Sequence, residues 1–498
     1  MGFNLKDINR YSLRLLEGIL LTGGLVRVLI FFQNRSFFLD EANLARNVVE
    51  KRPWDFFRTL DYEQYAPPLF LCVQKINVWW LGATEFGVRF FPLLCSLLSL
   101  WLFYKLSLRF IKPGIGLLFI FFMFSFSEYY LHFGTEGKQY ASDVMFALLL
   151  LNLALTQQLP WGWKAFSKWA LIGITIIWFS MPSVFILAGV GIFFMIESYP
   201  QWKKGVLFSI LGMVALWLAS FGLYYFAILK TDVESDYLQN YHSIYFLPGF
   251  PASMADIQQY GTIFQSILGT VVGHTILALL TGLSGLIFGL FFLIRQDWKK
   301  AVLLLLPILA VFFASTLHQY SLIPRLTLFF IPILLMVIGM GIQKLFDINR
   351  IWVKTVVVIF TIITLSIHDG AKYLWTRYEI EEIRQVLDVV EKQHLPNDLL
   401  YINHSAKPAF TFYTLLHKNK TKYHFDHYVE GDWRLNPAPE IFHINEQPAN
   451  RIWVIYSHLI SESARVEKDK EMGVLLKSFE VVKAINFKGA SAVLMERK

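Results

Sequence analysis

Residues 37–57, FFLDEANLARNVVEKRPWDFF, join the end of a strongly apolar run to an acidic pair, Asp40 and Glu41. After the pair, polar and apolar residues recur at helical spacing, which predicts a short amphipathic helix. Acids favour the first turn of a helix, so the pair fits a helix start. It also fits a functional site, because ionisable groups beside a hydrophobic span are costly. The two interpretations are compatible, and the rest of the chain decides where the pair lies.

The overall composition is typical of a membrane protein. The chain has 498 residues, of which 55% are hydrophobic and 16% charged, whereas soluble domains carry roughly 25% charged residues. Apolar runs of about 18 to 22 residues recur, long enough to span a bilayer. The net charge of +8 then indicates basic cytoplasmic loops and no nucleic-acid partner. Two cysteines, Cys72 and Cys95, without a CxxC or HExxH motif, predict no structural metal site.

The apolar runs predict an α-helical polytopic protein with about eleven transmembrane helices, a cytoplasmic N-terminus and a C-terminus outside. The predicted spans are 13–32, 88–108, 115–131, 141–157, 169–180, 182–197, 205–229, 266–294, 301–316, 322–342 and 353–368. Every predicted inner loop is then rich in Lys or Arg, as cytoplasmic loops are. The expected location is the plasma membrane, or the inner membrane where there are two.

The segment 67–82 is apolar, but it is predicted to lie in the membrane interface. It begins with Pro67-Pro68 and carries Lys75 and the pair Trp79-Trp80, and aromatic residues of this kind suit the headgroup region. A transmembrane helix is the alternative. Counting the segment as a span would invert every later loop and lose the agreement with the basic inner loops.

The chain divides into two domains. Residues 1–368 form the membrane domain, with a first outer loop at 33–87 and a second at 230–265. Residues 369–498 change to a soluble composition and predict a small α/β domain on the outer face. Its expected elements are an amphipathic helix at 372–394, buried strands at 398–402 and 451–458, and a closing hairpin at 479–497.

Ionisable residues at membrane depth or at span ends are functional candidates, and this topology gathers several on the outer face. The candidates are Asp40, Glu41, Gln64, Lys75, Glu136, Lys138, Tyr140, Asp143, His318, Tyr320 and Arg325. Simpler interpretations stay open for each of them. The acids could cap a helix or sit in solvated loops, the cations could anchor the chain to headgroups, and the histidine could be a packed side chain.

These residue types permit one specific chemistry. An acid at the membrane surface can act as general base towards an acceptor hydroxyl, and nearby Lys and Arg can hold a phosphate. A polyprenyl-phosphate sugar presents such a phosphate at the surface with its tail in lipid. An inverting transfer needs only one base and a stabilised leaving phosphate. Two alternatives remain: a transporter or flippase of a lipid-linked substrate, and a polymerase or ligase using a pyrophosphate-linked glycan.

Four stretches, in order, resemble the integral-membrane glycosyltransferases of the GT-C type. They are FLDEANLARNVV, QYAPPLFLCVQKINVWWLGATEFGVRFFPLLCSL, EGKQYASDVMFALLLL and PRLTLFFIPILLMVIGMGI. The resemblance is to the bacterial relatives of protein O-mannosyltransferases and of the lipid A aminoarabinose transferase, and it covers roughly residues 10–345. Its motifs are specific for the superfamily and say little about the substrate.

The resemblance implies roles for individual positions. The acid of the first outer loop is the catalytic base in that family, which matches Asp40, with its neighbour Glu41 as the second predicted catalytic residue. The loop after the third span lines the same cleft, which matches Glu136, Lys138, Tyr140 and Asp143. A basic residue on a late span meets the lipid phosphate, which matches Arg325. The implied donor is a polyprenyl-monophosphate sugar, and the transfer inverts the anomeric centre.

One departure from the family pattern is informative. Several relatives have His or Lys directly before the Pro-Pro pair, and this chain has Ala66, with Gln64 the nearest polar group. Lys138 or Arg325 must then carry more of the phosphate contact. The first outer loop has no DxD motif, so no obligatory divalent metal or other cofactor is expected. The acceptor is left open between protein, lipid and glycan, and the outer domain's role between a structural cap and acceptor recognition.

Overall fold

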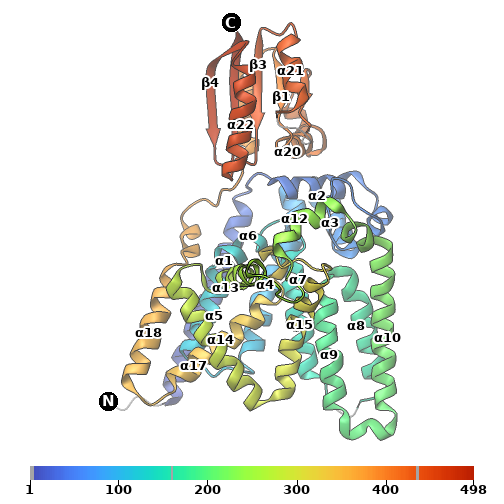
Figure 1. The fold of residues 1–498 in the computed structure, drawn as a ribbon, viewed down its shortest axis with the longest axis vertical. Coiled ribbons are helices and arrows are strands. Elements are labelled where there is room, and N and C mark those ends of the chain that lie inside the picture. Colours follow the sequence, from blue (N-terminus) through green and yellow to red (C-terminus); the bar gives the residue numbers. More distant parts are fainter. Residues whose placement is uncertain (1–4, 159–160, 433–436) are drawn as a thin grey trace.

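The computed structural model describes residues 5–158, 161–432 and 437–498. It is mostly helical, at 69%. A broad bundle of helices carries a small domain with a β-sheet at one end (Figure 1). Residues 1–4, where the predicted cytoplasmic N-terminus begins, lie outside the described residues.

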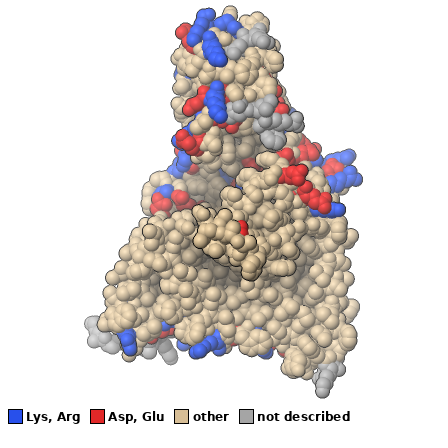
Figure 2. Space-filling model, in the orientation of Figure 1, with Lys and Arg blue, Asp and Glu red and all other residues tan. Residues whose placement is uncertain are grey.

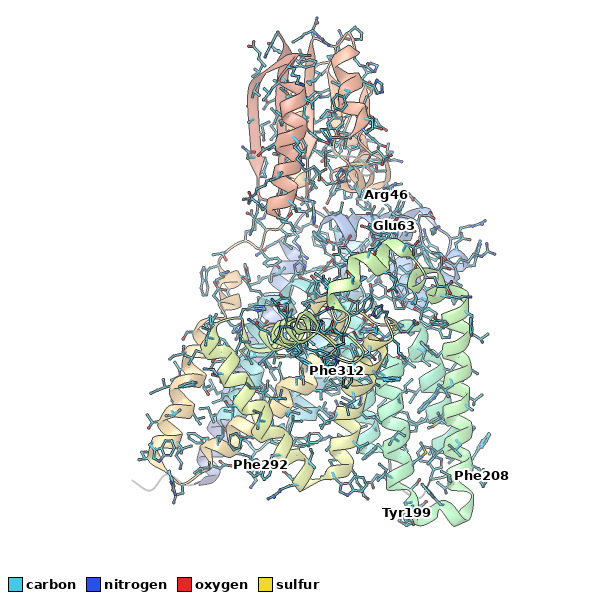
Figure 3. All side chains as sticks on the ribbon, in the orientation of Figure 1. Arg46, Glu63, Tyr199, Phe208, Phe292 and Phe312 are labelled. Carbon is cyan, nitrogen blue, oxygen red and sulfur yellow. The ribbon has the colours of Figure 1, made fainter. Side chains whose placement is uncertain are left out.

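The bundle contains longer helices that run roughly side by side, as seen in Figure 1. They are α1 (Leu5–Phe32), α4 (Glu85–Ser107), α5 (Ile115–Phe126), α7 (Tyr140–Thr156), α8 (Trp163–Phe179), α9 (Ser183–Glu197), α10 (Val206–Tyr224), α14 (Ile276–Gln296), α15 (Trp298–Thr316), α17 (Ile331–Phe346) and α18 (Ile351–Ser366). Two short helices, α6 (Glu128–Gly134) and α16 (Pro324–Thr327), lie between them in the chain. Phe208 on α10 is 78% exposed and points away from the bundle (Figure 3), as a lipid-facing side chain would.

Among the described residues, five helices are long and apolar enough to cross a membrane, and α5 with α6 would make a sixth if the bent pair is one span. Four shorter apolar helices, α7, α9, α17 and α18, complete the set. The chain is therefore a membrane protein of helical type, while the count of eleven spans stays a prediction.

The predicted third span, 115–131, is not one continuous helix but is interrupted near its outer end. Helix α5 stops at Phe126, and α6 continues after Ser127 at an angle of 46°. Arg27 of α1 supplies the physical reason, because it donates to the carbonyls of Phe124 and Ser125 at 2.8 and 2.9 Å. These carbonyls lie in the last turn of α5, where a cation also meets the negative end of the helix dipole. Arg27 has carbonyl partners and a seryl hydroxyl, Ser96, at 2.9 Å.

The second outer segment also differs from its prediction. Residues 230–265 were expected as a loop and 266–294 as a span, but the structure has α11 (Lys230–Val233), α12 (Asp236–His242) and α13 (Met254–Val272) before α14. Helix α13 is seen end-on in Figure 1 and so runs across the bundle helices. It ends at Gly273, whose φ of +99° turns the chain into α14. Hydropathy alone cannot see this break, because both sides are apolar.

Three further boundaries shift. The predicted span 322–342 is divided into α16 and α17. Helix α8 begins earlier than expected, at Trp163. In the outer domain, the expected helix 372–394 begins only at Ile383, because Glu381 and Glu382 are buried as anchors of an irregular segment.

The first outer loop folds into two helices, α2 (Leu39–Glu50) and α3 (Pro68–Leu81), joined through a 3₁₀ turn at Pro53–Phe57. Helix α3 starts at its proline pair and ends at Gly82, φ +87°. Its 14 residues span only about 21 Å, short of a bilayer core of about 30 Å. Trp79 and Trp80 are 65% and 73% exposed. These features fit a helix in the interface.

The carboxyl-terminal domain is a five-stranded mixed sheet in the order β2-β1-β3-β5-β4. The strands are β1 (Leu399–Ile402), β2 (Tyr428–Glu430), β3 (Arg451–Tyr456), β4 (Phe479–Phe487) and β5 (Ala490–Arg497). Its helices are α19 (Ile383–Gln393), α20 (Lys407–Thr411), α21 (Pro439–Glu446) and α22 (Glu462–Leu475). The predicted strands β1 and β3 and the hairpin β4–β5 are present, with β2 in addition.

This domain and the first outer loop share one hydrophobic core, which contains Phe37 and Leu44 from the loop and Ile383 and Tyr413 from the domain. Hydrogen bonds at Glu85, the first residue of α4, add to this hydrophobic contact. Glu85 accepts hydrogen bonds from Arg384 and from the Tyr413 hydroxyl. The outer domain is thus docked on the segment that carries the acidic pair (Figure 1).

Candidate active site

Asp40 lies in the first turn of α2, but it does not cap that helix. The N-cap is Phe38, and no side chain caps the helix start. Asp40 Oδ2 instead lies 3.4 Å from Arg325 Nη1 of α16, which is 285 residues away in the chain. The two side chains are 30% and 26% exposed. A ligand can therefore reach this ion pair.

Glu41, the second acid of the pair, is fully buried. Arg89 of α4 donates to both of its carboxylate oxygens at 2.6 Å, and the Gly137 N–H donates to Oε1 at 2.6 Å. Burial by itself would raise the pKa of Glu41, but the charge and hydrogen bonds of Arg89, with smaller contributions from Arg35 and Gly137, lower it below the usual value. Glu41 therefore connects α2 with α4 and with the segment before α7. Both of its carboxylate oxygens accept these internal hydrogen bonds, so it does not face a substrate.

The segment between α6 and α7 brings Glu136 and Lys138 to the same place, and both are buried. Lys138 Nζ donates to Gln64 Oε1 of the first outer loop. Burial lowers the pKa of Lys138, against the opposing charges of Asp40 and Glu136. The loop before the proline pair has no His or Lys directly before Pro67, and its polar contact to Lys138 comes from Gln64.

The charge of Asp40 acts on groups from several separate segments. They are Glu136 and Lys138 before α7, Tyr140 at its start, Tyr237 of α12, Arg325 of α16 and His458 of the carboxyl-terminal domain. The surroundings of Asp40 thus include groups from the helical domain and from the carboxyl-terminal domain.

The charge balance of the site depends on Glu136. Burial, and next the charge of Glu41, raise the pKa of Glu136 to about 8, so it is protonated at neutral pH. Its Oε2 has no hydrogen-bond partner among the described residues, and His132 Nε2 lies 3.5 Å from it. With Glu136 neutral, the cations around Glu41 and Asp40 outnumber the ionised carboxylates. The site is therefore suited to an anion.

The raised pKa makes a pH-dependent stability at Glu136 an expected result. A carboxyl group whose pKa is higher in the folded than in the unfolded protein contributes stability that is lost as pH rises towards the folded value. Wild-type thermal stability should fall between about pH 5 and 8, by up to about 1.4 kcal/mol per pH unit. Glu136→Gln should remove this slope in thermal unfolding of the purified protein, whereas Glu63→Gln, on an exposed loop residue, should leave it. Equal slopes in wild type and Glu136→Gln would contradict the assignment.

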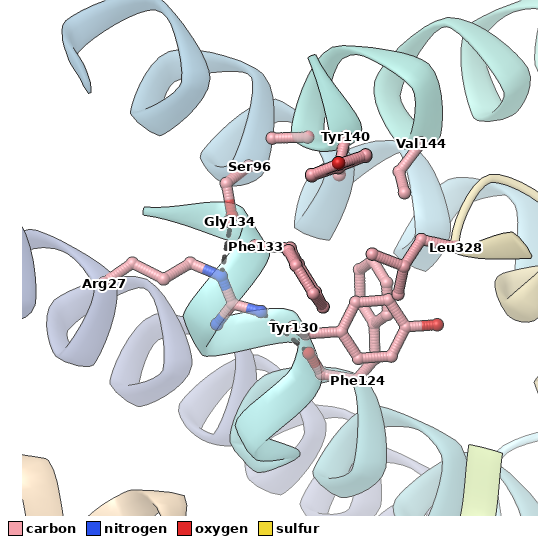
Figure 4. Close-up of a pocket in the computed structure, with 11 residues that line it drawn as sticks. Arg27, Ser96, Phe124, Tyr130, Phe133, Gly134, Tyr140, Val144 and Leu328 are labelled. Carbon is pink, nitrogen blue, oxygen red and sulfur yellow. Dashed lines mark hydrogen bonds between the residues drawn. The ribbon is translucent and has the colours of Figure 1, made fainter. Parts of the chain in front are cut away.

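Tyr140 and Asp143 extend the site into α7, and both are buried. Tyr140 lines a small cavity with Arg27, Tyr130 and Phe133 (Figure 4). Among the described residues, neither Asp143 Oδ1 nor the nearby Ser180 hydroxyl has a hydrogen-bond partner. Tyr140 is close enough to Arg325 and Asp40 to interact with both. Asp143 lies about one helical turn further into the bundle.

The structure places the other predicted site residues in local contacts. Lys75 Nζ donates to the Val49 carbonyl at 2.8 Å, at the end of α2. The Tyr320 hydroxyl donates to the Leu326 carbonyl at 2.8 Å and so shapes the turn that presents Arg325. His318 stacks on Phe246, with ring centroids 4.7 Å apart. None of these hydrogen bonds or stacking contacts is to Asp40.

Sequence reasoning missed several residues that hold the site. Arg89 was visible as a lone cation in the apolar stretch EFGVRFFP, the signal that intramembrane charges give. His458, Glu381 and Tyr413 come from the outer domain, and no pattern in the sequence indicates them. Among the described residues, no three His, Cys, Asp or Glu side chains form a group that could hold a metal ion.

No family model matches the chain, and no curated protein matches it. Solved structures do. ArnT from Cupriavidus metallidurans bound to undecaprenyl phosphate matches with a TM-score of 0.51 and 11% identity, over 96% of this chain and 98% of that one. The apo oligosaccharyltransferase of Archaeoglobus fulgidus matches with a TM-score of 0.51 and 11% identity, over 96% and 74% of the chains. This chain has the GT-C fold.

The resemblance found in the four sequence stretches is thereby confirmed at the level of the fold. ArnT in the apo state matches equally, with a TM-score of 0.50 and 13% identity. Both neighbours are GT-C glycosyltransferases. Because the match covers 96% of the chain, the GT-C fold includes the carboxyl-terminal domain as well as the helices. At such low identity it concerns the backbone, and the roles of side chains rest on their geometry.

Proposed function

We propose that this protein is an inverting glycosyltransferase that moves a sugar from a polyprenyl-monophosphate donor to an acceptor hydroxyl at the outer face of the membrane. The single observation that carries the proposal is the partly exposed pair of Asp40 and Arg325, with buried Lys138 nearby. A carboxylate that could act as a base thus has two cations beside it. The fold of glycosyltransferases, one of them bound to undecaprenyl phosphate, supports it.

The outer face is assigned from charge. Figure 2 shows Lys and Arg side chains along the edge of the helical part opposite the carboxyl-terminal domain, with a broad uncharged band between. Basic loops stay in the cytoplasm, so the cleft and the carboxyl-terminal domain face outwards. A lipid-linked donor would enter from the outer leaflet with its tail in the uncharged band.

The transfer proceeds by a single displacement. The acceptor oxygen attacks the anomeric carbon from the face opposite the phosphate, and its proton passes to a carboxylate oxygen of Asp40. The bond between the anomeric carbon and the phosphate oxygen breaks as the new glycosidic bond forms. The polyprenyl phosphate leaves with the bonding electron pair, and the anomeric configuration inverts.

Charge accumulates on the phosphate during this step. The donor phosphodiester carries one negative charge, and the leaving phosphomonoester carries two. Cations fixed in a partly buried site stabilise the second charge more than the first, which lowers the barrier. Arg325, with its planar fork of donors, and Lys138 supply this charge. Binding of the phosphate by Arg325 would also release the Asp40 oxygen that it contacts. We therefore propose that no divalent metal is obligatory.

The donor assignment is tested with lipid-linked sugars. Purified protein should consume polyprenyl-monophosphate sugars and release polyprenyl phosphate, while pyrophosphate-linked glycans remain intact. Consumption of the pyrophosphate-linked donor alone would indicate a polymerase or ligase instead. Movement of a labelled lipid across vesicles without sugar transfer would indicate a flippase.

Lys138→Gln should weaken binding of the monophosphate donor by about 10- to 100-fold, because a charge-assisted contact to phosphate is lost. The matched control is Lys51→Gln, in the same outer loop region as α2, which breaks only a partly exposed pair with Asp61. Donor binding is measured with radiolabelled lipid and the purified variants. Unchanged donor affinity in Lys138→Gln would remove Lys138 from the phosphate site.

A further inference from the structure

The outer domain brings one titratable side chain to the edge of the cleft, His458, which no function has yet been given. It lies two residues after the end of β3 and has a φ of +58°. A backbone conformation of this kind is uncommon for a residue other than glycine and persists only where the surroundings fix it. His458 therefore occupies a place that the fold maintains against a conformational cost.

Buried Glu381 fixes the histidine ring. His458 Nδ1 lies 2.5 Å from Glu381 Oε1, and the Ser457 hydroxyl donates to Oε2 at 3.2 Å. A carboxylate accepts hydrogen bonds, so Nδ1 carries the proton and Nε2 is the other ring nitrogen. No hydrogen bond from the described residues reaches Nε2, and the side chain is 29% exposed.

The same contacts lead directly to Asp40. The backbone N–H of Leu39, next to Asp40, also hydrogen-bonds Glu381. The His458 ring packs on Phe38, with ring centroids 5.3 Å apart. The charge of Asp40 in turn acts on His458. Glu381 and His458 thus contact Leu39 and Phe38, the two residues directly before the proposed base, Asp40.

The donor phosphate is proposed to bind on one side of Asp40, next to Lys138 and Arg325. His458 lies on the other side, for which no ligand has yet been proposed. Lys138 and Arg325 come from the membrane domain, where the phosphate of a lipid-anchored donor must lie. His458 comes from the carboxyl-terminal domain, and this domain lies above α2 in Figure 1. In Figure 2 the surface is recessed between this domain and the helical part. An acceptor that meets Asp40 from outside would approach on this side.

We propose that His458 is an acceptor-binding residue, whose Nε2 hydrogen-bonds an oxygen of the acceptor close to the hydroxyl that Asp40 deprotonates. This inference rests on the proposed glycosyl transfer. Glu381 acts through His458 as a positioning residue, because it holds both the ring and the Leu39 N–H. The carboxyl-terminal domain is then part of the active site and more than a cover for it.

His458→Asn is the informative variant, because Asn tolerates a positive φ and removes the imidazole ring. The matched control is His424→Asn, since His424 forms an exposed His–Glu pair with Glu391 at 2.8 Å on the same domain. The purified full-length variants are compared by thermal unfolding, by binding of the radiolabelled monophosphate donor, and by sugar transfer to a membrane extract from cells that lack the gene.

His458→Asn should bind the donor within about twofold of wild type, yet transfer about 10- to 100-fold less efficiently, with half-maximal rate at a higher extract concentration. His424→Asn should match wild type in every assay. Wild-type transfer by His458→Asn, or a loss of transfer in proportion to donor affinity, would overturn the inference. If His458→Asn unfolds, His458→Gln must show the same split. A wild-type protein that does not consume the donor would overturn the proposed function itself.

Discussion

Asp40→Asn should reduce sugar transfer by about 10²- to 10⁴-fold, the range that a general base contributes. The amide has almost the same shape as the carboxylate and can still accept a hydrogen bond from Arg325, so the cleft keeps its geometry. It cannot take the proton of the acceptor hydroxyl. Transfer is measured as polyprenyl phosphate released from the monophosphate donor by purified protein.

The control for this variant is Asp61→Asn. Asp61 lies in the same outer loop, and its exposed side chain pairs with Lys51 at 2.9 Å. It should transfer at the wild-type rate, and both variants should fold and insert. Wild-type turnover by Asp40→Asn would refute Asp40 as the base. Loss of folding in Asp40→Asn would show that the carboxylate is structural.

Glu41→Gln should lower stability by about 3 to 5 kcal/mol, the cost of leaving a buried ionic partner uncompensated. Arg89 is 1% exposed and would keep its charge beside Arg35, which also lowers the stability. The effect should appear as a lower unfolding temperature and a poorer yield of folded protein. Any Glu41→Gln protein that folds should retain a substantial turnover per folded molecule.

The double variant Glu41→Gln/Arg89→Met separates a structural from a catalytic role. Removing both charges should recover part of the stability that Glu41→Gln loses, and the double-mutant cycle should show a favourable coupling between the two side chains. A Glu41→Gln protein that is as stable as wild type but inactive would instead make Glu41 a catalytic residue.

These two experiments distinguish the roles of Asp40 and Glu41, which the sequence alone does not separate. Asp40 and Glu41 are adjacent acids in one helical turn, and both were predicted to be catalytic. The structure gives them opposite surroundings, with Asp40 partly exposed beside Arg325 and Glu41 sealed against Arg89. Consecutive residues of a helix project about 100° apart, so one acid faces the cleft while its neighbour faces the core.

The docking of the carboxyl-terminal domain bears on the same pair. The Phe37 N–H donates to the Tyr413 hydroxyl at 2.8 Å, and the Leu39 N–H bonds Glu381. Two residues of the outer domain thus hold the backbone directly before Asp40. Arg89 and Gly137 hold the residue directly after it. The base therefore depends on both domains for its position.

Features that depend on local composition could be predicted from the sequence. Runs of apolar residues predicted a helical membrane protein, and the proline and tryptophan pairs predicted an interfacial helix where α3 lies. Alternating and buried apolar stretches predicted β3 and the final hairpin. The order of the four quoted stretches was enough to indicate the GT-C fold. Each of these predictions depends on residues that are close together in the chain, so a single sequence is sufficient to make it.

Which charges meet became visible only in the folded protein. Arg325 reaches Asp40 across 285 residues, Arg89 neutralises Glu41, and His458 arrives from a different domain. Hydropathy also could not locate the bend after α5, because the carbonyls freed there are satisfied by Arg27 from another helix. A buried charge or carbonyl needs a partner, but the packing of distant segments selects it. The sequence therefore supplied the candidates, and the packing decided which acid can meet a substrate and which one holds the cleft together.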